Sequence, residues 1–141
     1  ELIAKGHKFA NDSDTECLIH GYEEYGTDLL SKLRGMFAFV IWDTRTNTMF
    51  GARDHFGIKP FYYSLFNKTL IFASETKSIL EFPGFKKELN EEALEQYLSF
   101  QYSVLPETFF KGIFRVQTCA LPICRTLYDF QRREIRCSEI F

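Results

Sequence analysis

The sequence predicts an α+β fold in which antiparallel strands are covered by helices. Residues 36–42 form a continuous apolar run rich in aromatic and branched side chains, a composition and length that favour a strand over a helix. Because apolar and polar residues do not alternate in this run, we expect both of its faces to contact other layers. Short polar turns separate it from three further strand-like segments, which predicts antiparallel pairing: 48–53, 61–66 and 69–73.

Helical segments lie before and after these strands. Residues 1–8 resemble the end of a helix terminated by Gly6. Ser13-Asp14-Thr15-Glu16 is typical of a helix start, and the apolar residues that follow are spaced by three and four until Gly26. A short helical turn is expected around residues 29–33.

Two more helices are predicted after the strands. The first covers residues 75–82 and is stopped by Pro83-Gly84. The second covers residues 91–99 and is capped by Asn90, with acidic residues in its first turn. Its inner side is expected to carry four side chains: Ala93, Leu94, Tyr97 and Leu98.

Composition and charge exclude some function classes. The 141 residues make one domain or a part of one, and 17 basic against 19 acidic residues give a formal net charge of -2. This balance offers no electrostatic footprint for nucleic acid or for an anionic membrane. No segment has the apolar length of a bilayer span or the pattern of a secretory signal, so a cytoplasmic protein is expected.

The four cysteines predict neither a metal site nor a disulfide framework. Cys17 stands alone, and Cys119, Cys124 and Cys137 are crowded near the end without a C-x2-C pair. Thiols stay reduced in the cytosol, which argues against disulfides. No metal-binding residues are therefore predicted.

Five segments taken together indicate a family. They occur in order and spacing that resemble the glutaminase domain of glutamine-hydrolysing asparagine synthases, a class II glutamine amidotransferase: 6–9, 13–16, 33–39, 52–63 and 72–79. The resemblance covers residues 1–115. It implies an αββα sandwich of the N-terminal-nucleophile hydrolase type, with two antiparallel sheets between helical layers. We expect this sandwich to be incomplete at both ends of the chain.

The resemblance also implies a chemistry. In the family, an N-terminal cysteine attacks the side-chain amide of glutamine, with its own α-amino group as base. Glu1 is not that cysteine, so no catalytic residue is predicted and the chain as given is expected to hydrolyse no glutamine. Asp14 matches the position that binds the α-amino group of glutamine, a charge-assisted contact that confers specificity for an amino acid.

Simpler roles compete for the same residues. Asp14 can serve as a helix cap with no ligand, and the two roles do not exclude each other. Arg53-Asp54 can form a structural ion pair or turn, and His55 beside it is a weak candidate for a catalytic base. Cys17 is expected to act as a small hydrophobe. His7 and His20 are expected on the surface, and Trp42 in the core.

The resemblance ends at Arg115, which predicts a division of the chain into residues 1–115 and a tail, 116–141. The octapeptide at 116–123 resembles the translation of a sequencing adapter, so the tail is interpreted as non-native protein. Resequencing the source locus across the codon of Val116 tests this hypothesis, and a continuous reading frame that contains the octapeptide contradicts it.

Two functions remain open from the sequence. The first is part of a glutaminase that passes ammonia to an ATP- and magnesium-dependent synthetase domain, which amidates aspartate and is absent from this chain. The second is a catalytically inert relative with a scaffold or partner-binding role. A homodimer is a further expectation for the full-length protein. Edges and faces left without neighbouring strands predict reduced stability and a tendency to associate.

Overall fold

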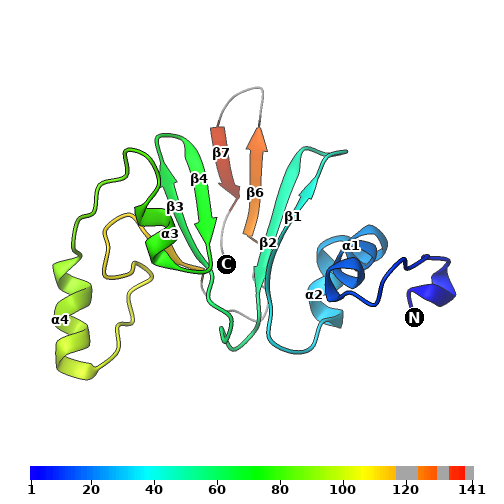
Figure 1. Cartoon of the computed structure of the whole chain (residues 1–141), viewed down its shortest axis with the longest axis horizontal. Helices are drawn as coiled ribbons and strands as arrows, with labels where there is room; N and C mark the ends of the chain where they lie inside the picture. The colour runs from blue at the N-terminus through cyan, green and yellow to red at the C-terminus, as the bar shows by residue number, and fades with distance from the viewer. Residues whose placement is uncertain (117–123, 130–133, 139–141) are drawn as a thin grey trace.

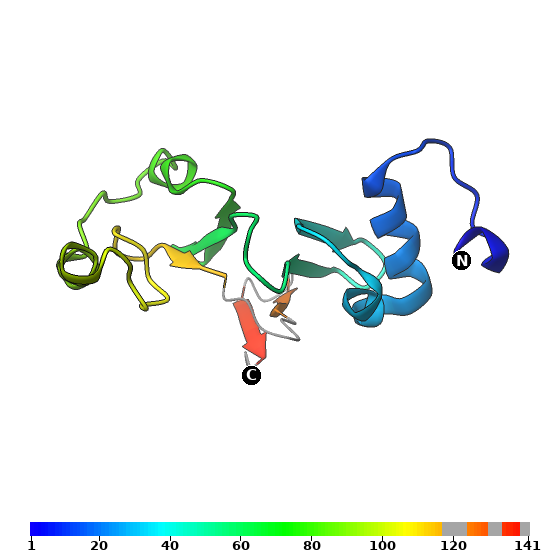
Figure 2. The ribbon, with the colours of Figure 1, turned by 90° about the horizontal axis from the view of Figure 1, so that it is seen from below.

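Two antiparallel sheets stand next to each other with helices on their outer sides (Figure 1). The computed structural model describes residues 1–116, 124–129 and 134–138. Figure 2 shows the same layers from below, with α1 outside one sheet and α3 and α4 beyond the other. The predicted α+β sandwich of antiparallel sheets is confirmed.

The first sheet has the strand order β1-β2-β6-β7. Strands β1 (Ala38–Asp43) and β2 (Thr48–Arg53) pair from Ala38 opposite Arg53 to Asp43 opposite Thr48. Strand β6 (Cys124–Asp129) pairs with β2 and then with β7 (Glu134–Ser138). Both added strands belong to the segment 116–141, whose non-native origin stays a prediction; most of its adapter-like octapeptide, 117–123, lies outside the described residues.

The second sheet has the order β4-β3-β5. Strands β3 (Tyr62–Phe66) and β4 (Thr69–Ala73) form a hairpin, and β5 (Phe114–Arg115) pairs with the start of β3. Asn67 and Lys68 at the hairpin tip have φ values of 48° and 63°. Two consecutive positive φ angles give a turn whose twist matches that of the flanking strands.

The four consecutive strands divide between the two sheets, whereas their short spacing alone predicts one sheet. The connection between β2 and β3, residues 54–61, is too long for a tight hairpin turn. It carries the chain from one sheet to the other, as Figure 1 shows.

The helices begin and end near the predicted residues. Helix α1 (Asp14–Tyr25) starts where the Ser13 hydroxyl accepts a hydrogen bond from the Thr15 N–H group, and α4 (Glu91–Phe100) starts where the Asn90 side chain accepts one from the Ala93 N–H group. The remaining helical elements are short: η1 (Ile3–Lys5), η2 (Gly26–Asp28), α2 (Leu29–Lys32) and α3 (Thr76–Leu80). Within the described ranges, no helix is long and apolar enough to cross a bilayer.

The core of the first layer lies between the helices and one face of β1 and β2. Leu30, Phe50 and Ala52 are buried there, and the Tyr22 ring stacks on Phe50 with 5.4 Å between ring centroids. Phe39 and Ile41 pack against the same cluster, so alternate residues of β1 face the helices.

The other face of β1 and β2 meets the second sheet. A Cβ atom built on Gly51 would lie 3.4 Å from the Phe61 ring and 3.6 Å from a methyl group of Val40. Phe61 in turn meets Phe72 edge-to-face. Both faces of β1 therefore have neighbours, as predicted, although the cover is uneven along the strand.

Two predicted core positions are wrong. Trp42 is 40% exposed because it lies near the end of β1, on the face that the helices do not cover. Leu98 is 74% exposed, since α4 buries only a narrow stripe around Ala93. Periodicity identifies an apolar side chain but does not supply the surface that covers it.

Candidate functional site

One face of α1 forms the wall of a cavity. The residues Asp14, Cys17, Gly21 and Tyr25 are spaced by three and four along the helix and line a space of about 570 Å³. The opposite walls come from η1, the segment that precedes α1, and α2. The cavity has a mainly apolar floor and an entrance bordered by polar residues: Asn11, Asp12 and Ser13.

The carboxylate of Asp14 is exposed at this cavity. Ser13 supplies the side-chain cap of α1, so Asp14 is the first residue of the helix and not its cap. No hydrogen bond or ion pair of the Asp14 side chain occurs among the described residues. The carboxylate is therefore accessible to a ligand in the cavity, with the positive end of the helix dipole beside it.

Glu16 holds the entry to α1 in place. Its carboxylate accepts hydrogen bonds from the backbone N–H groups of Ala10, at 2.7 Å, and Asn11, at 2.9 Å. These two hydrogen bonds lower the pKa of Glu16 below its ordinary value. The segment that carries the polar entrance of the cavity is thus fixed to the first turn of α1.

Cys17 does not behave as the buried small hydrophobe that its position on the helix predicts. It is exposed and lines the cavity together with Asp14. The apolar stripe of α1 is wider than the surface the sheet offers, so Tyr22 contacts the sheet and Cys17 does not.

The charged pair Arg53 and Asp54 is buried and structural. The Asp54 carboxylate accepts hydrogen bonds from the backbone N–H groups of Phe56, Ile58 and Lys59 at 3.0 to 3.1 Å. Burial alone would raise the pKa of Asp54, but these hydrogen bonds outweigh it and the pKa lies below its ordinary value.

Arg53 is held in the same way by acceptors. Its guanidinium donates to the backbone carbonyls of Gly57, Lys59 and Val116. Burial lowers the pKa of Arg53, with a smaller contribution from Arg115. The structural role considered for this pair is confirmed, whereas His55 beside it is exposed.

His7 and His20 are not the surface residues that the sequence predicts. Both are partly buried, and their Nδ1 atoms lie 3.2 Å apart. The pKa of His20 is raised, chiefly by its hydrogen bond to Glu23. Helical spacing links His20 to Glu23, but nothing in the spacing of the sequence links either residue to His7.

Comparison with known proteins decides the family. A family model described as a glutamine amidotransferase domain matches residues 1–132. The chain belongs to the glutamine amidotransferase domain family. The resemblance inferred from the five sequence segments is thereby confirmed.

The relatives of this amidotransferase domain include several asparagine synthetases. It is 47% identical over 117 residues, 83% of the chain, to "Asparagine synthetase [glutamine-hydrolyzing] 1" of Bacillus subtilis (strain 168), covering 18% of that protein. It is 38% identical over 123 residues, 87% of the chain, to "Amidase chry2" of Gibberella zeae, again covering 18%. A relative from Methanocaldococcus jannaschii, "Putative asparagine synthetase [glutamine-hydrolyzing] 2", is 32% identical over 126 residues, which are 88% of the chain and 24% of that relative. The chain thus spans about a fifth of these proteins.

Proposed function

We propose that this amidotransferase domain binds L-glutamine in the cavity beside α1, with the Asp14 carboxylate on the α-ammonium group. The accessible carboxylate at the cavity is the observation that carries the proposal. An ammonium and a carboxylate in contact form a charge-assisted hydrogen bond, which selects an amino acid over the corresponding acid without the amine.

The names of the relatives support a role in asparagine formation for the protein that carries this domain. In this proposal, glutamine supplies ammonia and a linked synthetase part uses ATP and magnesium to amidate aspartate. The domain's own contribution is recognition of glutamine, and the nucleophile of the reaction is not assigned to any residue of the present chain. Cytoplasmic location and a homodimer belong to the same proposal.

Binding to the 141-residue chain tests the role of Asp14. Amide resonances of residues 11–17 are followed by NMR during titration with L-glutamine and with glutaramate, which has the same amide and carboxylate but no ammonium group. We expect L-glutamine to shift these resonances at a lower concentration than glutaramate. In Asp14→Asn, the difference between the two ligands disappears, whereas Asp28→Asn, an exposed carboxylate outside the cavity, preserves it. Equal binding of both ligands by the unmodified chain contradicts the proposal.

Activity of the full-length protein provides the second test. Asparagine formation is measured with either glutamine or ammonium chloride as nitrogen donor. Asp14→Asn should weaken the glutamine-dependent reaction through KM and leave the ammonia-dependent reaction unchanged. An equal loss with both donors would show that the substitution damages the fold and not glutamine recognition.

A further inference from the structure

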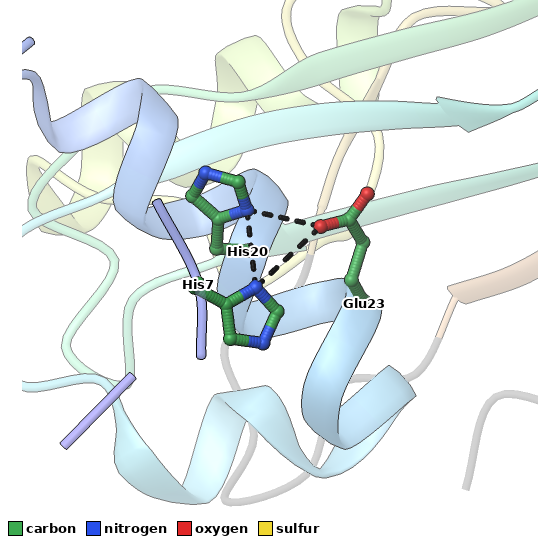
Figure 3. Close-up of side chains that lie close together, drawn as sticks. All are labelled: His7, His20 and Glu23. Carbon is green, nitrogen blue, oxygen red and sulfur yellow. Dashed lines mark hydrogen bonds and ion pairs between the residues drawn. The ribbon is translucent and has the colours of Figure 1, made fainter. Parts of the chain in front are cut away.

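Three side chains converge on the face of α1 that turns away from the cavity (Figure 3). His20 and Glu23 belong to one turn of α1, and His7 comes from the segment after η1. Figure 3 shows the two imidazole rings and the Glu23 carboxylate pointing toward a common centre. The cluster joins the first residues of the chain to a helix that begins several residues later.

The distances in this cluster are those between the ligands of one metal ion. The Nδ1 atoms of His7 and His20 lie 3.2 Å apart, and Oε2 of Glu23 lies 3.0 Å from the His20 atom and 3.8 Å from the His7 atom. Zinc bound tetrahedrally with bonds of about 2.0–2.1 Å requires ligand separations of about 3.4 Å. The three atoms thus approximate one face of a tetrahedron.

Outer carboxylates orient both imidazole rings. The Nε2 atom of His7 lies 3.2 Å from Oε2 of Glu24, and Nε2 of His20 lies 3.6 Å from Oε1 of Glu16. A histidine that binds zinc through one nitrogen commonly donates the other N–H group to a carboxylate, which fixes its tautomer. With both Nε2 atoms protonated, both Nδ1 lone pairs point into the cluster.

Two lone pairs that face each other at 3.2 Å require a cation between or beside them. A proton can fill this role by leaving one ring as imidazolium, and Lys5, which pairs with Glu24 at 2.6 Å, adds a further positive charge at the edge. A divalent ion satisfies both rings and the Glu23 carboxylate at once. Imidazole with carboxylate suits zinc among the divalent ions available to proteins.

We propose that His7 Nδ1, His20 Nδ1 and Glu23 Oε2 bind a zinc ion, with Glu24 and Glu16 holding the two rings. Glu23 is exposed, which leaves the fourth position of the tetrahedron open to water. The ion crosslinks the segment around His7 to α1. Because Glu16 also holds the backbone of Ala10 and Asn11, the crosslink restrains the segment that borders the cavity.

The test titrates the metal-free 141-residue chain with zinc chloride by calorimetry. We expect one ion per chain and a loss of affinity of more than about 100-fold in His7→Gln and in His20→Gln, with about 10- to 100-fold in the outer-carboxylate variant Glu24→Gln. His55→Gln is the matched control, since His55 is exposed and outside the cluster, and it should bind as the unmodified chain does. Glu23→Gln tests the exposed ligand with no threat to folding and should also weaken binding.

Cobalt chloride identifies the ligand atoms independently of affinity. Tetrahedral cobalt with nitrogen and oxygen ligands gives visible absorption without the thiolate charge-transfer band that Cys17 or another cysteine would produce. Such a spectrum, lost in His7→Gln, supports the site. Zinc binding unchanged in both histidine variants, a thiolate spectrum, or no binding to the unmodified chain overturns the proposal and leaves a proton shared between the two rings.

Discussion

Two groups of charged residues in this domain are treated in opposite ways. In the connection after β2, Arg53 and Asp54 are buried and every strong contact they make is to the backbone. Around α1, Asp14, His20 and Glu23 remain accessible and contact other side chains or nothing within the described residues. Full satisfaction by the backbone identifies a structural charge, whereas an accessible charge on a fixed helix is suited to a ligand.

The largest test of this comparison is Asp54→Ala. Three backbone N–H groups lose their acceptor in a buried site, so we expect a loss of about 3–5 kcal/mol in the free energy of unfolding. Urea unfolding followed by tryptophan fluorescence measures it. Asp28→Ala, at an exposed position, should change stability by less than about 0.5 kcal/mol. A comparable loss in both variants would contradict the distinction between the two groups.

Acid should reproduce part of this effect. The pKa of Asp54 in the folded domain is lowered below its unfolded value, so its stabilisation is complete above the unfolded pKa, near 4. It is lost as the pH falls from that value through the folded pKa. Unfolding free energies measured at decreasing pH should therefore fall less steeply for Asp54→Asn than for the unmodified chain. Parallel pH profiles would show that Asp54 does not contribute.

Arg53→Lys should have a smaller effect. Lysine keeps the charge but cannot place three donors on the carbonyls of Gly57, Lys59 and Val116, so we expect a loss of about 1.5–3 kcal/mol. Urea unfolding again provides the measurement. Arg45→Lys, at an exposed ion pair, is the matched control and should be close to neutral.

The smallest effects are expected at the start of α1, where they separate the cap from the ligand residue. Ser13→Ala removes the N-cap and should cost about 1 kcal/mol. Asp14→Ala leaves that cap intact and should cost less than about 0.5 kcal/mol. Thermal unfolding of both variants measures the difference. A larger loss in Asp14→Ala would assign the cap to Asp14 and weaken its proposed role in binding glutamine.

Local sequence signals predicted the elements of this domain well. The range of β2 and of β4 is as predicted, and Ser13, Gly26 and Asn90 begin or end helices where their side chains or backbone freedom allow it. These features depend on neighbouring residues, so a single sequence contains them. The five family segments gave the family for the same reason, since their residues and spacing are written in the chain.

Only the tertiary structure decided which residues meet. It placed four consecutive strands in two sheets, left Trp42 and Leu98 exposed, and turned Cys17 toward the cavity. It also brought His7 to His20, two residues whose sequence separation corresponds to no helix or strand period. Backbone propensity acts over a few residues, whereas burial, charge satisfaction and ligand geometry depend on surfaces supplied by distant segments.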